Sequence, residues 1–230
     1  LSPSMVIHAA ALTDTTVCEQ DQDRAIAVNV EGTVNLLQGL EPEKCFVAYV
    51  STDLVYEGRD GPYGETYTPQ PLNFYGQTKM AGEEVIGDWP GRSLILRPAL
   101  LFGPASPNKA SFLGWFKENF EAHKPLELFV DEFRSPLCVE DFFPALWGLY
   151  RKKATGVFNV GGNKTYSRFD MGSIFAKRFG YDETLIQKRH IAEVNTPAPR
   201  PANVALKIEK LVRATGFSPR NYERGLQIMK

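Results

Sequence analysis

Short apolar runs alternate with helix-like stretches along the first hundred residues. The apolar runs are MVIHAA at residues 5–10, CFVAYVST at 45–52 and SLILRPALLFG at 93–103, and helix-like stretches lie at about 21–40 and from about Tyr75 onward. This alternation is typical of βαβ units, in which helices cover a parallel sheet. The runs Met5–His8 and Phe46–Val50 are continuously apolar, as expected of strands buried on both faces. The sequence therefore predicts an α/β fold with a doubly wound parallel sheet.

Both of these strands are followed by small or polar residues, in HAAALTD and STDLVYEG. In doubly wound sheets, ligands bind at the carboxyl ends of the strands, so we expect these two loops to line the binding site. The segment 57–73 is rich in glycine and proline. It predicts a long surface loop that leads into the helix at Tyr75.

After Pro98 the pattern becomes mixed. A Pro/Gly loop follows in GPASPNK, then a helical stretch at about 110–123, a strand in PLELFV, a strand end and helix in SPLCVEDFFPALWGLYRKK, a strand in GVFNVGG and a helix in SRFDMGSIFAKRFGY. We predict that residues 1–103 form part of a dinucleotide-binding domain with the catalytic residues. Residues 104–230 are predicted to form mainly a smaller substrate-binding domain, from which some segments return to the sheet.

Composition excludes several classes of protein. Lysine and arginine total 26 and aspartate and glutamate total 27, so no net charge favours nucleic acid or an anionic membrane surface. The three cysteines form no CxxC pair, and His123 and His190 have no partners at metal-binding spacing, which argues against a metal site and a disulfide framework. No apolar run approaches the ~20 residues of a membrane span. We expect a cytoplasmic protein without a membrane partner.

The stretch NFYGQTKMAGEEVI, residues 73–86, places Tyr75 four residues before Lys79 at the start of a predicted helix. Residues with this spacing lie one above the other on the same helix face. Such a pair also arises readily by chance, so its meaning depends on the surrounding residues.

Several motifs surround this pair in a fixed order. They are VIHAAALTD, NVEGTVNLL, YVSTDLVYEG with GPYGE, the YGQTK stretch, LILRPALLFGP and RPANVALKIEKL. The pattern resembles the extended short-chain dehydrogenase/reductases, and most closely the dTDP-4-dehydrorhamnose reductases and their relatives, which include the noncatalytic regulatory subunit of methionine adenosyltransferase. The resemblance implies a Rossmann-type fold with a smaller mixed α/β substrate domain, NAD or NADP as cofactor, and a sugar nucleotide as the small-molecule substrate. It admits a homodimer.

The resemblance implies that Thr52, Tyr75 and Lys79 form the catalytic set, and the chemistry supports this assignment. A carbonyl that accepts a hydride becomes an alkoxide and needs a proton donor. Tyr75 would be the donor, and the ammonium of Lys79 is expected to lower its pKa from about 10. Thr52 would hydrogen-bond the substrate oxygen, a role for which Ser51 is the alternative.

Further residues are assigned by the same resemblance. Those assigned to the cofactor are Ala9, Ala10, Ala11, Asn29, Ser51, Tyr75, Lys79, Arg97 and Pro98, and those assigned to the substrate are Thr52, Asp53, Arg134 and Arg200. Asn29 would organise the site or only satisfy buried backbone. Arg134 would bind a diphosphate or form a surface salt bridge. Arg200 would touch the substrate or clamp the C-terminal segment, and His8 is expected to be a core histidine.

The dinucleotide fold opens with a strand and a G-x-G-x-x-G turn, and this sequence contains no such turn. Its first strand matches the fourth strand of the family. We therefore expect about two βα units, roughly 30 residues each, to be absent before Leu1.

The leading hypothesis is an NAD(P)-dependent reductase of a keto group on a sugar nucleotide. The alternatives are a regulatory or NAD(P)-binding protein without turnover and a nucleotide-sugar epimerase. A dehydratase is disfavoured, because it usually has a second acidic residue after the Thr–Asp pair, where this sequence has Leu54.

Overall fold

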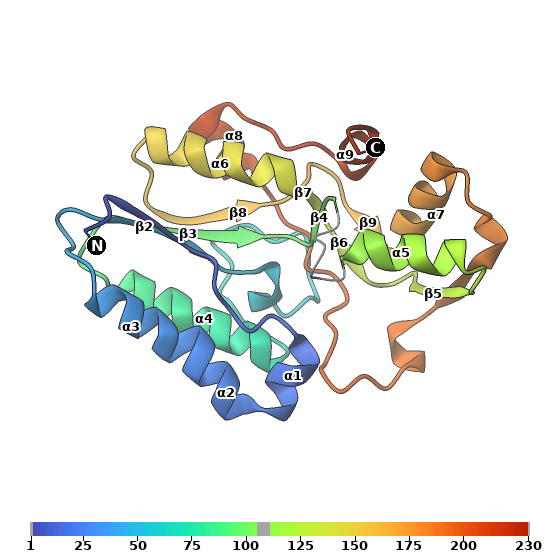
Figure 1. Ribbon diagram of the computed structural model, residues 1–230, viewed down its shortest axis with the longest axis horizontal. Coiled ribbons are helices and arrows are strands. Elements are labelled where there is room, and N and C mark those ends of the chain that lie inside the picture. The colour runs from blue at the N-terminus through green and yellow to red at the C-terminus, as the bar shows by residue number, and fades with distance from the viewer. Residues whose placement is uncertain (1, 105–110, 230) are drawn as a thin grey trace.

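A parallel four-stranded sheet forms the centre of the computed structural model, which describes residues 2–104 and 111–229 (Figure 1). The strands are β1 (Met5–His8), β2 (Phe46–Val50), β3 (Ser93–Pro98) and β8 (Gly156–Val160). They pair in the order β1-β2-β3-β8, and every pair is parallel. This is a Rossmann-like α/β arrangement, so the predicted fold class is confirmed.

Helices cover both faces of this sheet (Figure 1). On one face lie α1 (Thr15–Gln20), α2 (Gln22–Ile26), a π-helical turn (Ala27–Glu31), α3 (Gly32–Gln38) and α4 (Phe74–Gly87), and on the other lie α6 (Val139–Arg151) and α8 (Glu209–Thr215). Side chains of β2 alternate between the two layers: Val47 and Tyr49 pack in the cluster on the α4 side, whereas Phe46 and Ala48 pack in the cluster on the α6 side. The strand is therefore buried on both faces, as its apolar run predicts.

Helix α4 begins where the sequence predicts. The side chain of Asn73 caps it by accepting a hydrogen bond from the backbone N–H of Gly76 at 2.9 Å. The face of α4 that carries Tyr75, Lys79 and Glu83 is buried, although two of these side chains carry charge. A helix with such a face needs polar partners on the elements that it covers.

Gly82 allows α4 to approach β2 closely, because a Cβ at this position would overlap the hydroxyl group of Tyr49. We expect Gly82→Ala to lower the free energy of unfolding by about 1–3 kcal/mol, since extra atoms in a packed core force shifts of neighbouring groups. Urea unfolding measures this loss. Gly87→Ala is the matched control, because a Cβ there meets nothing within 4 Å. Equal stability of the two variants would contradict the prediction.

The chain after β3 builds a smaller mixed layer beside the sheet and returns to it. Its elements are β4 (Leu101–Phe102), α5 (Phe112–Glu121), β5 (Leu126–Phe129), β6 (Phe133–Arg134), β7 (Leu137–Cys138), β9 (Tyr166–Ser167), α7 (Arg168–Phe179), β10 (Ile186–Arg189) and α9 (Tyr222–Gln227). Short 3₁₀ turns lie at Asp53–Val55, Glu183–Leu185 and Ile191–Glu193. An aromatic core joins α5 to α7, where the rings of Phe116 and Phe175 are 5.4 Å apart.

The predicted helix and strands of the second half are therefore present, and β8 returns to the main sheet as expected. Residues 105–109 of the predicted Pro/Gly loop and residue 110, the first of the predicted helix, lie outside the described residues. The division of the chain at residues 103 and 104 stays a prediction. Among the helices of the described residues, none has the length and apolar character to span a membrane.

Candidate active site

A cavity of about 550 Å³ opens at the carboxyl ends of β1, β2 and β3. Most of the residues predicted for the site line it: Ala9, Ala11, Ser51, Thr52, Asp53, Tyr75, Lys79, Pro98, Arg134 and Arg200. Residues 198–201 and Arg168 of the second half close its other side. The fold thus brings the two sequence halves together around one space. Ala10, Asn29 and Arg97 were also predicted, but they are not among the lining residues.

Tyr75 and Thr52 lie together at the cavity, both nearly buried. Thr52 follows β2 directly, and its hydroxyl donates a hydrogen bond to Oδ1 of Asp53 at 3.2 Å. Burial raises the pKa of Tyr75, the charge of Asp53 raises it further, and a hydrogen bond with Thr52 opposes the change. The sequence predicted a lowered pKa, so the direction differs. The reason is that burial of the phenol outweighs the effect expected from a cation one helical turn away.

Lys79 lies one turn after Tyr75 and its side chain is almost completely buried, at 2% exposure. Its ammonium stands 4.0 Å from the centre of the Tyr49 ring. Burial lowers the pKa of Lys79 to about 8, and the carboxylate of Glu83 opposes this shift. The charge of Lys79 is therefore sensitive to its surroundings near neutral pH.

Arg97 lies in β3 and turns away from the cavity, toward a buried carboxylate. Its Nε and Nη2 donate to the two oxygens of Glu83 at 2.8 and 2.5 Å, and Nη1 donates to the hydroxyl of Tyr56 at 2.8 Å. Ser51 donates to the same carboxylate at 2.5 Å. The expected contact of Arg97 with a cofactor therefore has no support in this geometry, because its donors serve Glu83 and Tyr56.

Asn29 lies in the π-helical turn and joins two parts of the site. Its amide oxygen accepts from the Leu12 N–H at 2.8 Å, and its amide nitrogen donates to the Leu12 carbonyl at 3.1 Å and to Thr78 Oγ1 at 2.9 Å. Thr78 in turn donates to the carbonyl of Tyr75 at 2.8 Å. Asn29 thus satisfies buried backbone and also ties the loop after β1 to the first turn of α4.

His8 is a core histidine, as expected. Its Nε2 shares a hydrogen bond of 2.9 Å with the hydroxyl of Thr33, and its ring packs 5.5 Å from that of Tyr49. Burial lowers its pKa, and the nearby charge of Lys79 lowers it further. His8 is therefore neutral at physiological pH.

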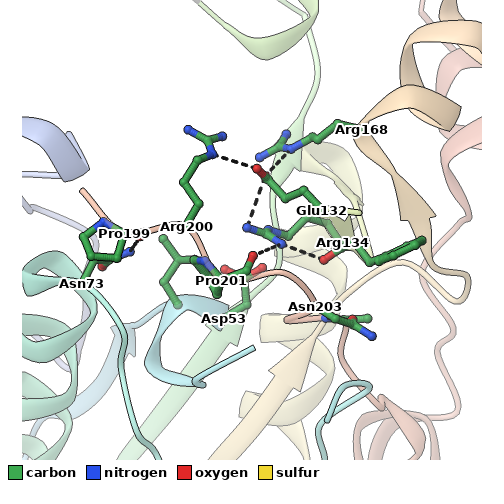
Figure 2. A network of polar contacts seen from close by, with 12 residues as sticks. Asp53, Asn73, Glu132, Arg134, Arg168, Pro199, Arg200, Pro201 and Asn203 are labelled. Atoms are coloured by element: carbon green, nitrogen blue, oxygen red, sulfur yellow. Dashed lines mark hydrogen bonds and ion pairs between the residues drawn. The ribbon is translucent and has the colours of Figure 1, made fainter. Parts of the chain in front are cut away.

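Three arginines surround one buried carboxylate at the far side of the cavity (Figure 2). Glu132 is fully buried and forms ion pairs with Arg134 at 3.2 Å, Arg168 at 2.7 Å and Arg200 at 2.8 Å. Burial alone would raise the pKa of Glu132, but the charges of these three arginines lower it to about 2. The four side chains together carry an excess of two positive charges, which favours an anion at this end of the cavity.

The arginines of this cluster differ in exposure. Arg134 is 5% exposed and donates to the carbonyls of Phe133 at 2.7 Å and Pro201 at 3.2 Å, so its alternative as a surface salt bridge is wrong. The side chain of Arg200 is 37% exposed and that of Arg168 is 16% exposed. Sequence reasoning missed Arg168 and Glu132. A signal for Arg168 was its place directly after Ser167, which starts a capping box with Asp170.

Asp53 stands between the candidate catalytic residues and the arginine cluster. It is buried, it lines the cavity, and its Oδ2 has no hydrogen-bond partner among the described residues. Burial raises its pKa to about 6, although the charge of Arg134 opposes the shift. Across residues 2–104 and 111–229, no group of three or more His, Cys, Asp or Glu side chains could hold a metal ion.

Comparisons with known proteins match almost the whole chain. The family described as the RmlD substrate binding domain matches residues 1–229. A probable low-salt glycan biosynthesis reductase of Haloferax volcanii is 28% identical over 229 residues, which cover 98% of this chain and 76% of that protein. The dTDP-4-dehydrorhamnose reductase of Aggregatibacter actinomycetemcomitans is 28% identical over 237 residues, which cover 98% of this chain and 80% of that protein.

A solved structure has the same fold. The dTDP-4-dehydrorhamnose reductase of Bacillus anthracis, crystallised in complex with NADP, superposes with a TM-score of 0.89 at 24% identity. The match covers 98% of this chain and 79% of that one.

Proposed function

Since the chain belongs to the RmlD substrate binding domain family, we propose that it is an NAD(P)-dependent reductase of a keto group on a sugar nucleotide. The relatives named as reductases support this proposal. The observation that carries it is a single cavity with Thr52, Tyr75 and Lys79 on one side and the Arg168 and Arg200 guanidinium groups on the other. Such a cavity offers a proton donor for a carbonyl at one end and positive charge for a diphosphate at the other.

Tyr75 is the proposed proton donor. A ketone that accepts a hydride at carbon gains negative charge on oxygen, and the phenol of Tyr75 transfers its proton to that oxygen. Because burial raises its pKa, Tyr75 is protonated before the reaction and can transfer this proton to the substrate oxygen. Thr52 holds the same substrate oxygen by a hydrogen bond, and the ammonium of Lys79 stabilises the phenolate that remains on Tyr75.

The carboxyl ends of the strands are suited to a nicotinamide cofactor, which supplies the hydride when bound. Ala9, Ala11 and Pro98 border the cavity with small or compact side chains, so a flat ring can approach the backbone there. Lys79 would hold the hydroxyl groups of the nicotinamide ribose. The relative from Bacillus anthracis was crystallised with NADP, which fits this assignment.

We assign the diphosphate of the substrate to Arg200 and Arg168 in the first place. They are more exposed than Arg134, whose Nη1 already donates to two backbone carbonyls. Arg134 adds its positive charge from a buried position beside Glu132. After neutralisation of Glu132, the two remaining positive charges of the cluster match the two negative charges of a diphosphate.

Arg200→Ala should raise KM for a sugar nucleotide about 10- to 100-fold, because it removes hydrogen bonds to a charged group worth roughly 1.5–3 kcal/mol. The Kd for NADPH should stay the same. Steady-state kinetics and calorimetric titration measure the two quantities. Arg189→Ala is the control, since Arg189 forms an exposed ion pair with Glu127 away from the cavity lining. A KM equal to that of the control would remove Arg200 from the substrate site.

The decisive test of the function is oxidation of NADPH or NADH by the full-length protein with a 4-keto sugar nucleotide. A reductase consumes one reduced cofactor for each product molecule. An epimerase leaves the amount of cofactor unchanged while the sugar is altered, and a regulatory protein binds cofactor without turnover. Either of these results would overturn the proposal. A cytoplasmic location and a homodimer remain part of it as predictions.

A further inference from the structure

A buried polar network lies behind the candidate catalytic residues, and of its members only Ser51 lines the cavity. At its centre the carboxylate of Glu83 accepts hydrogen bonds from Ser51 at 2.5 Å and from Nε and Nη2 of Arg97 at 2.8 and 2.5 Å. Glu83 and Arg97 are 7% and 3% exposed and do not belong to the cavity lining. The network continues from Arg97 to Tyr56, and from Tyr56 to Asn159 at 3.1 Å.

We propose that Glu83 and Arg97 act as a pair of positioning residues: Glu83 favours the charged form of Lys79, Arg97 limits this effect by its ion pair with Glu83, and the pair fixes α4 to the ends of β2 and β3. The inference rests on the proposed function in that Lys79 takes part in the reaction. Neither residue lines the cavity, so both would act through Lys79 and Ser51.

The helical spacing makes this arrangement possible. Tyr75, Lys79 and Glu83 follow one another at intervals of four residues, so they form one row on the face of α4 that packs against the sheet. Glu83 then binds β2 through Ser51 and β3 through Arg97. Since Ser51 directly precedes Thr52, the same carboxylate sets the distance between the strand end that carries Thr52 and the helix turn that carries Tyr75.

The charge of Lys79 depends on groups from four elements. His8 on β1 and Tyr49 on β2 lie near its ammonium, Tyr75 and Glu83 are its neighbours along α4, and Arg97 on β3 acts through its ion pair with Glu83. His8 is neutral because of its burial, and the Tyr49 and Tyr75 phenols keep their protons because burial raises the pKa of each. The charge of Glu83 opposes the lowering of the Lys79 pKa that burial causes.

Arg97 limits this effect, since a cation bound to both oxygens of Glu83 offsets much of its negative charge. Removal of the carboxylate should therefore destabilise the charged form of Lys79, and removal of the guanidinium should stabilise it. Glu83 and Arg97, which form an ion pair with each other, are thus expected to shift the proton affinity of Lys79 in opposite directions.

The test is a titration of Lys79 in full-length protein labelled with ¹³C at the lysine Cε, without substrate, with the signal assigned by its loss in Lys79→Met. The parent should titrate near 8, as burial and Glu83 together dictate. Glu83→Gln should weaken the proton affinity of Lys79 at least tenfold, or about one pH unit, and Arg97→Met should strengthen it. The double variant should return toward the parent.

The pH profile of kcat/KM gives a second readout. As pH rises, Lys79 loses its charge and the rate falls, so the fall should begin at lower pH in Glu83→Gln and at higher pH in Arg97→Met. Shifts of the Lys79 titration in the same direction in both variants, or no shift in either folded variant, would overturn the inference and leave the pair a merely structural role. If Glu83→Gln does not fold, the two opposing effects are still tested. Arg97→Met must raise the pH at which Lys79 titrates, and the double variant must bring that pH back down.

The two readouts separate this inference from the proposed function. A protein without reductase activity whose Lys79 titration shifts as expected would refute the reductase and keep the electrostatic role of the pair. An active reductase whose Lys79 titration is unaffected by the substitutions would support the proposed function and refute the electrostatic role of Glu83 and Arg97.

Discussion

Tyr75→Phe is expected to lower kcat by at least ~100-fold in the full-length protein, within the range that general acid catalysis supplies. The substitution removes the hydroxyl and keeps the ring, which is 8% exposed and fits among the same neighbours. Thr52 and Lys79 remain in place, so in the proposed mechanism the substrate oxygen keeps a hydrogen bond but loses its proton donor. The Kd for NADPH should change little, because the substitution leaves the proposed cofactor contacts of Lys79 and the strand ends unchanged.

Single-turnover reduction of a 4-keto sugar nucleotide measures the chemical step directly. Tyr67→Phe is the control, since Tyr67 is exposed, lies in the loop before α4 and is not among the lining residues. It should leave kcat unchanged. If Tyr75→Phe reduces the substrate at a rate close to that of this control, another group must deliver the proton.

Glu132→Gln should destabilise the fold by about 3–5 kcal/mol, as is typical when one partner of a buried ionic cluster is removed. The substitution leaves three guanidinium groups close together without the carboxylate that they share. In a chain of this size, 1 kcal/mol corresponds to about 2–4 °C in Tm, so we expect a fall of roughly 6–20 °C. Calorimetry or thermal circular dichroism measures it.

The control for this variant is Glu127→Gln, which removes an exposed carboxylate from its ion pair with Arg189. Its Tm should stay near that of the parent, because exposed ion pairs contribute little. A similar Tm for both variants would mean that the arginine cluster does not depend on Glu132.

The same residue predicts the behaviour of the protein in acid. The pKa of Glu132 is held at about 2, below its ordinary value of 4.5. A group whose pKa is depressed by folding stabilises the fold above its ordinary pKa and loses this contribution as pH falls toward the depressed value. The parent should therefore lose stability between about pH 4.5 and 2, and Glu132→Gln should lose less over the same range.

Much of the first half could be predicted from the sequence because its signals are local. Continuous apolar runs mark β1 and β2, and the Tyr75 and Lys79 spacing marks the buried face of α4. Because the predicted strands are parallel, the residues that follow them are expected at the same edge of the sheet. Each of these inferences needs only a short window of sequence and the geometry of a helix or a strand.

The arginine cluster could not be predicted in this way. Glu132 and Arg200 are 68 residues apart, and a charged residue in a polar stretch reads as solvated until its partners are known. Arg97 did carry a usable signal, since a charged residue inside the apolar strand SLILRP requires a buried partner. The direction of the Tyr75 pKa was missed because spacing shows that a cation is near but does not show how deeply the phenol is buried.

The return of β8 to the main sheet limits how the cavity can open. Proteins that close around a ligand by hinge bending do so at a few loop or element-terminal residues, which absorb the change in backbone conformation. Here the backbone leaves the sheet after β3, comes back through α6 and β8, leaves again, and comes back a second time through α8. A hinge between the sheet and the smaller layer would have to flex each of these crossings together. Local shifts of the cavity border require fewer changes, and the segment 198–201, which belongs to no helix or strand, is one of the loops that form this border.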